Sequence, residues 1–175
     1  MSARTWVGPD ALTRQRILRE TRSVAIIGAS VNPSRASYFV NTYLASTSDY
    51  ELYLVNPTIS EVDGTPVYPS LAELPVVPDL VDVFRRYDDL PSVLVDTLAL
   101  PELPKTLWLQ LGLWHEQVAR DGEAAGLQVV MDRCLKIEHA RFHGGLHLGG
   151  FNTGVIDSSR PGHAAFIGVT SSTTQ

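Results

Sequence analysis

The chain has 175 residues, of which 44% are hydrophobic and 19% charged, enough apolar material for one good core and little for a second. Its net charge of −5 argues against a surface that binds duplex nucleic acid or an anionic membrane. The single cysteine, Cys134, the absence of an apolar run near the ~20 residues that span a bilayer, and an N-terminus without a signal-peptide pattern together predict a cytoplasmic protein.

The first part of the chain predicts a helix followed by a strand-helix-strand unit. Asp10 can cap an amphipathic helix over residues 11–20. An apolar run over residues 23–28 that ends in glycine is typical of a strand buried on both faces of a parallel sheet. Helical spacing over 33–45 and a second apolar run over 52–55 then complete the unit, whose crossover is right-handed in parallel sheets.

The same alternation continues toward the C-terminus. We expect residues 58–69 to form a turn-rich connection and Ser70 to cap a short helical turn. The remaining predicted elements are strands over 80–84, 106–110 and 127–131 and helices over 88–100, 114–125 and 135–141. Together these elements predict an α/β fold with a doubly wound, mostly parallel five-stranded sheet and helices on both faces.

Changes in composition suggest three segments. Residues 1–22 carry the helix that leads into the fold, and residues 23–141 make the predicted ligand-binding domain. Residues 142–175 form a tail whose first part is too glycine-rich for a regular element. We interpret the tail as wrapping the domain or a partner subunit, which makes a homodimer or a further protein partner reasonable.

The end of the first strand carries the clearest sign of a ligand site. Ligands of open α/β sheets bind beyond the carboxyl ends of the strands, and here Gly28, Ala29 and Ser30 form a small-residue turn that runs into a helix. Backbone N–H groups and the helix N-terminus suit a phosphate there, while Ser34 adds a hydroxyl and Arg35 a charge. Two glycines of the dinucleotide fingerprint are missing, so a tight turn without a ligand stays open as an alternative.

The end of the second strand bears on the choice of cofactor. A nicotinamide dinucleotide site normally places Asp or Glu at this point, where the chain has Asn56 and Pro57. The pair therefore disfavours NAD, and an uncharged amide tolerates the ribose 3′-phosphate that coenzyme A carries. By residue type alone, a plain turn initiator is the better explanation of the pair.

The other strand ends add aromatic, cationic, amide and thiol groups at the same edge of the sheet, and these residues are Phe84, Arg85, Gln110, Gly112 and Cys134. An aromatic face packs against adenine or pantetheine, a cation neutralises pyrophosphate, and a glycine permits close backbone approach. We expect Arg86 to be solvated instead. Cys134 is either a reactive thiol or a small packed residue.

No set of residues with catalytic spacing stands out. The sequence offers neither a Ser-His-Asp arrangement nor paired carboxylates at the strand ends. His139, His143 and His147 are spaced four apart, but Gly144 and Gly145 interrupt the helix that would align them as metal ligands. We therefore predict neither a catalytic set nor a metal site.

Five motifs resemble the bacterial CoA-binding domain proteins, and they are residues 28–30, 55–57, 82–85, 108–112 and 130–139. That family is similar to the N-terminal nucleotide-binding domain of succinyl-CoA synthetase α-subunits. The resemblance covers about residues 23–141. It implies a Rossmann-like fold with coenzyme A near the Gly28 turn, Asn56, Phe84, Arg85 and Gln110.

The resulting hypothesis is a protein that binds coenzyme A or an acyl-CoA in a non-catalytic or regulatory role. One alternative is an NAD(P)-binding oxidoreductase or a redox sensor. Another is a partner subunit whose nucleotide pocket is vestigial.

Overall fold

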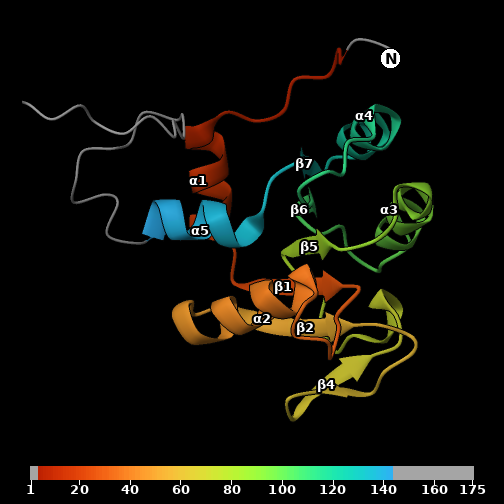
Figure 1. Ribbon diagram of the computed structural model, residues 1–175. Coiled ribbons are helices and arrows are strands. Elements are labelled where there is room, and N and C mark those ends of the chain that lie inside the picture. Colours follow the sequence, from red (N-terminus) through yellow and green to blue (C-terminus); the bar gives the residue numbers. More distant parts are fainter. Residues whose placement is uncertain (1–3, 144–175) are drawn as a thin grey trace, which may run out of the picture.

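A parallel sheet with helices on both faces makes up residues 4–143, which are the residues that the computed structural model describes (Figure 1). The five strands expected from the apolar runs are all present, as β1 (Ser23–Ile27), β2 (Glu51–Val55), β5 (Leu80–Val83), β6 (Thr106–Leu109) and β7 (Gln128–Val130). They pair in parallel in the order β2-β1-β5-β6-β7. The predicted α/β, Rossmann-like fold is thus confirmed.

Two further strands correct the expected number from five to seven. Within the supposed turn-rich connection, β3 (Glu61–Val62) and β4 (Thr65–Tyr68) form a hairpin, and β4 pairs in parallel with β2. Asp63 and Gly64 make the two-residue turn with positive φ values of 50° and 81°, as tight hairpin turns require. With β4 included, the six parallel strands follow the Rossmann order 3-2-1-4-5-6 by position along the chain.

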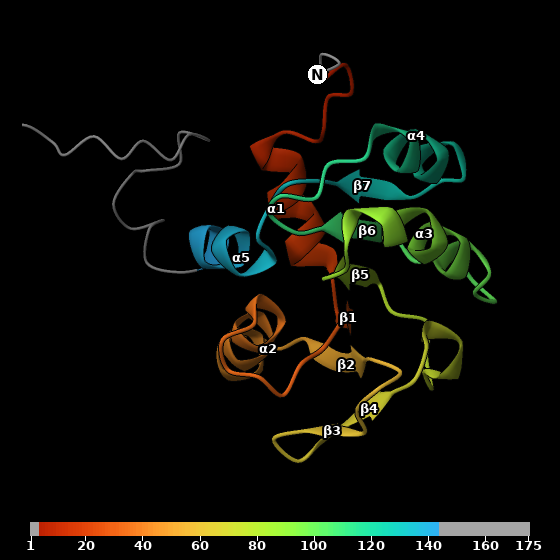
Figure 2. The same ribbon diagram turned by 45° about the vertical axis from the view of Figure 1, so that its right-hand side comes forward.

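The sheet separates two hydrophobic cores because its central strands bury both faces. Along β1, Ala25 and Ile27 join one core while Val24 and Ile26 join the other. Helices α3 (Leu90–Leu98) and α4 (Glu116–Ala124) cover the first face, and α1 (Ala11–Glu20), α2 (Ala36–Thr47) and α5 (Leu135–His143) cover the second. Figure 2 shows the two groups on opposite sides of the sheet.

Side-chain hydrogen bonds to the backbone determine where the first two helices begin. Asp10 caps α1 as predicted, by accepting a hydrogen bond from the Thr13 N–H at 2.8 Å. Helix α2 begins at Ala36, three residues later than expected, because Asn32 holds the preceding turn by accepting from the Ser34 N–H at 2.9 Å. Of the tail predicted over residues 142–175, Phe142 and His143 belong to α5, and the remainder lies outside the described residues. No helix in the described part is long and apolar enough to cross a membrane.

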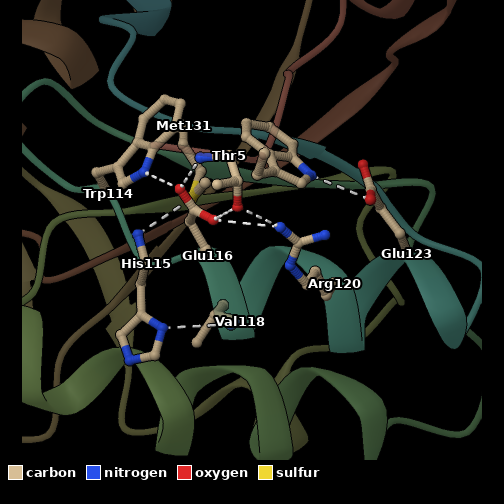
Figure 3. A network of polar contacts seen from close by, with 9 residues as sticks. Thr5, Trp114, His115, Glu116, Val118, Arg120, Glu123 and Met131 are labelled. Atoms are coloured by element: carbon tan, nitrogen blue, oxygen red, sulfur yellow. Dashed lines mark hydrogen bonds and ion pairs between the residues drawn. The ribbon is translucent and has the colours of Figure 1, made fainter. Parts of the chain in front are cut away.

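The segment before α1 is fixed to α4 by a polar network (Figure 3). Thr5 donates its backbone N–H and its hydroxyl to Glu116, and Arg120 donates to both of these side chains. The indole of Trp6 donates to Glu123 at 3.1 Å and packs edge-on against the Trp114 ring at 5.5 Å. The N-terminal segment is therefore bound to the element that follows β6.

Candidate functional site

A pocket of about 730 Å³ opens at the carboxyl ends of β1, β2, β5 and β6, where the strand order reverses. This is where ligands bind in open α/β sheets, and the volume suits a small molecule. The structure brings most of the predicted site residues to its wall, namely Gly28, Ala29, Ser30, Arg35, Asn56, Phe84, Arg85, Gln110 and Cys134.

The Gly28 turn is tied to its neighbouring strands. Gly28 has a φ of +85°, and a Cβ there would collide with the carbonyl oxygen of Phe84. The N–H groups of Gly28 and Ala29 both donate to the Val55 carbonyl, at 2.9 and 3.3 Å. These two N–H groups thus serve the fold, contrary to the expectation that they face a phosphate.

The donors that the turn offers to an anion lie further along the chain. Ala36 and Ser37 occupy the first turn of α2, where backbone N–H groups have no partner within the helix. Both residues line the pocket, which therefore receives the positive end of α2. Ser30 also lines it, although its Oγ accepts from the Asn32 N–H at 3.1 Å.

Asn56 supports the turn from the end of β2. Its Nδ2 donates to the Ala29 carbonyl at 2.7 Å, and its Oδ1 accepts from both the N–H and the hydroxyl of Thr58. Groups of the protein therefore satisfy most of the hydrogen-bonding capacity of the Asn56 amide. These bonds explain the presence of an asparagine at this position without a ligand. The residue still lies at the pocket wall and presents no negative charge there.

Three arginines give the pocket a positive character. Arg35, Arg85 and Arg86 line it against a single acid, Asp89. Arg86 is exposed, as expected, yet it is also part of the wall. In a chain whose net charge is −5, this is a local concentration of cations, and guanidinium groups bind phosphate oxygens well.

A buried hydrogen bond lies at the end of β6. The Gln110 Nε2 donates to Asp82 Oδ1 at 2.7 Å, and Asp82 is completely buried on β5. Burial raises the pKa of this carboxyl group to about 8, although the Gln110 hydrogen bond opposes the shift. Burial thus favours the protonated form of Asp82, and its partner Gln110 lines the pocket.

Three predicted residues lie away from the pocket wall. Ser34 remains in the loop before α2, where its N–H is held by Asn32. Gly112 has a φ of +82° and donates its N–H to Asp132 at 2.8 Å. Pro57 lines a second pocket of about 330 Å³, which shares Arg85 and Asp89 with the first.

Several wall residues are not predicted by the sequence, namely Val31, Ala36, Ser37, Thr58, Ile59, Leu111 and Leu113. A helix that begins at residue 33 would put Ser37 in its second turn, away from the strand ends. The apolar members follow strand ends closely, so their position in the chain is the available signal. Side-chain type does not single them out because apolar residues are common in such loops.

Comparisons with known proteins agree with this geometry. Residues 22–140 match the model of a family described as the CoA binding domain. The chain is 35% identical over 132 residues to the uncharacterized protein YneT of Bacillus subtilis (strain 168), and the match covers 75% of this chain and 96% of that protein.

Solved structures resemble the chain over most of its described part. Cell-free ID.343 from Thermus thermophilus is 34% identical with a TM-score of 0.70, covering 77% of this chain and 99% of that one. A dinucleotide-forming acetyl-coenzyme A synthetase of Ca. Korarchaeum cryptofilum, in complex with phosphate and ADP, is 21% identical with a TM-score of 0.57. That match covers 66% of this chain and 27% of the synthetase, and shows a shared fold.

Proposed function

The chain belongs to the CoA binding domain family, and from this premise we propose that it binds coenzyme A or an acyl-CoA in the pocket at the carboxyl ends of β1, β2, β5 and β6. The proposed role is that of a cofactor-binding protein that holds or presents the ligand. A catalytic role is not part of the proposal.

The observation that carries the proposal is the concentration of positive groups in one pocket. Arg35, Arg85 and Arg86 and the N-terminus of α2 all contribute to it. Coenzyme A carries a pyrophosphate and a ribose 3′-phosphate, so several cations and N–H donors are required close together. The negative net charge of the whole chain means that this attraction has to be local.

Apolar wall residues supply the second requirement of the ligand. Phe84, Ile59, Leu111 and Leu113 line the same pocket as the arginines. Adenine stacks on aromatic and apolar surfaces, and the pantetheine arm has a long stretch of low polarity. Mixed walls of this kind favour an amphipathic anion over inorganic phosphate alone.

The alternative of an NAD-binding oxidoreductase receives less support. A ribose diol is usually held by an acid at the end of the second strand, where this chain has Asn56. Its amide oxygen already accepts two hydrogen bonds from Thr58. A cytoplasmic location, a homodimer and a protein partner stay predictions of the sequence.

Calorimetric titration with three ligands tests the proposal. We expect coenzyme A to bind most tightly, dephospho-coenzyme A more weakly because it lacks the 3′-phosphate, and NAD more weakly still. Binding raises the free energy of unfolding by about 2.7 kcal/mol at a ligand concentration of 100 Kd, so melting temperatures should follow the same order. No binding of coenzyme A at millimolar concentration, or tighter binding of NAD, would contradict the proposal.

A further inference from the structure

Asp82 is a completely buried acid directly behind the pocket. It lies on β5 in register with Ile26 of β1 and Trp108 of β6, on the face of the sheet that α2 and α5 cover. Its Oδ1 accepts the 2.7 Å hydrogen bond from Gln110, and its Oδ2 has no hydrogen-bond partner among the described residues. A buried polar atom without a partner is costly, so this placement calls for an explanation.

Gln110 connects this acid to the pocket. Its side chain lines the pocket, and its Nε2 is taken by Asp82. The other amide atom, Oε1, accepts no hydrogen bond within the described residues. The buried side-chain atoms that lack a partner there are Asp82 Oδ2 and Arg141 Nη2, so Oε1 is not fully buried. Because an unpaired atom that is not buried is accessible, Oε1 is open to the pocket.

We propose that Asp82 is a positioning residue, which holds the Gln110 amide with its carbonyl oxygen toward the pocket so that the site selects a ligand group that donates a hydrogen bond. The inference rests on the proposed function. For coenzyme A, the donor is either the amino group of adenine or an N–H or hydroxyl group of pantetheine.

The carboxyl group of Asp82 is compatible with this role. Its Oδ1 accepts from Gln110 Nε2, and this hydrogen bond leaves Oε1 outward. Burial favours the protonated form, in which one carboxyl oxygen still accepts a hydrogen bond and the other carries the proton. In that form no negative charge lies behind a pocket that we assign to a phosphate ligand.

A double-mutant cycle tests this inference, with binding measured for the whole ligand and for two fragments of it. The variants are Asp82→Leu, Gln110→Leu and the double variant, and the probes are coenzyme A, pantetheine and adenosine 3′,5′-bisphosphate. We expect each single variant to weaken coenzyme A binding about tenfold, the size of one lost hydrogen bond. The double variant should bind no more weakly than Gln110→Leu, because Asp82 acts only through Gln110.

The fragments separate positioning from general damage to the fold. If Asp82 orients one acceptor, the loss in Asp82→Leu falls on the fragment that carries the matching donor and spares the other. Equal losses on both fragments, or single losses that multiply in the double variant, would overturn the inference. If the leucine variant fails to fold, Asp82→Ala takes its place, because alanine also removes the acceptor of Nε2, and it should show the same one-fragment loss.

A measurement without ligand keeps this inference distinct from the proposed function. In the apo protein, the side-chain NH₂ resonances of Gln110 should exchange slowly and should shift as Asp82 titrates. Both features should disappear in Asp82→Leu, whereas in Asp82→Asn only the response to pH should disappear, because the asparagine oxygen is still able to accept from Nε2. Their absence in the wild-type protein would refute the positioning role, whereas failure of wild-type protein to bind coenzyme A or either fragment would refute the proposed function.

Discussion

Thr5 donates its backbone N–H and its hydroxyl to the two carboxylate oxygens of Glu116, each at 2.7 Å. These bonds, with the Thr5 hydroxyl as the largest cause, lower the pKa of Glu116 to about 2. The bound carboxylate thus links the start of the chain to α4, close to the loop that contributes Leu111 and Leu113 to the pocket.

Loss of this carboxylate should release the N-terminal segment. Because the folded pKa lies below the ordinary value of 4.5, the stabilisation is present above pH 4.5 and is lost as the pH falls toward 2. The protection of the Thr5 and Trp6 amides against hydrogen exchange, relative to the intrinsic rate at each pH, should therefore fall over that range. In Glu116→Gln, this protection should be low already at pH 7 and should not change further between pH 4.5 and pH 2. Unchanged protection in the variant would argue against the assignment.

Gly28→Ala should be severely destabilising for two reasons. The added Cβ collides with the Phe84 carbonyl oxygen, and alanine is strained at the left-handed φ of this position. We expect a loss of more than about 3 kcal/mol in the free energy of unfolding. Gly112→Ala is the matched control, since Gly112 has a similar φ of +82° with nothing within 4 Å of its added Cβ. It should lose only about 1–2 kcal/mol. Similar losses in urea unfolding would contradict the steric argument.

Arg85→Ala should weaken coenzyme A binding by about ten- to a hundredfold, because a charged hydrogen bond contributes roughly 1.5–3 kcal/mol. Within residues 4–143 the Arg85 side chain forms no hydrogen bond or ion pair, so the melting temperature of the apo protein should change little. Arg19→Ala removes an exposed arginine from the last turn of α1 and should alter neither quantity. If calorimetry shows equal coenzyme A affinities for the two variants, Arg85 does not contribute to the binding site.

The buried Asp82 predicts a stability that falls as the pH rises from acidic to neutral values. Its folded pKa of about 8 exceeds the ordinary 3.8, so the unfolded chain releases the proton first and stability falls as the pH rises from about 4 to 8. The upper limit is about 1.4 kcal/mol for each unit of the pKa difference. Urea unfolding of wild type and Asp82→Asn should diverge across this range, with the wild type losing more; parallel curves would mean that Asp82 is ionised in the folded protein.

Cys134 is half-buried and lines the pocket, which predicts exchange with a bound disulfide of the ligand. The Cys134 thiolate would attack coenzyme A disulfide, forming a mixed disulfide and releasing one molecule of free coenzyme A. Mass spectrometry should detect this adduct sooner than a glutathione adduct formed from glutathione disulfide. Cys134→Ser should form neither. If the two disulfides react at equal rates, the thiol is merely accessible.

The central fold is predictable from the sequence because its signals are strong and local. Continuous apolar runs between turn residues mark all five central strands, and each strand end then follows from the run that precedes it. For this reason the sequence alone is enough to assign Gly28, Phe84 and Gln110 to one edge of the sheet, where the structure has them.

The hairpin of β3 and β4 is not predicted because its signals conflict. Asp63-Gly64 is a strong turn pattern, but β3 has only two residues and Pro66 in β4 is typical of an edge or a loop. Tertiary pairing with β2 stabilises β4, and local sequence does not record such pairing. The same holds for the N–H groups of Gly28 and Ala29, whose acceptor lies on another strand.

The hydrogen bonds beneath the pocket also bear on the thermodynamics and kinetics of binding. Val55 accepts from Gly28, Ile27 accepts from the Phe84 N–H at 2.9 Å, and Asn56 holds Ala29. This floor is already ordered without a ligand, so association need not freeze it and the accompanying entropy loss is small. We expect the association rate to be set by diffusion and charge rather than by rearrangement of the floor.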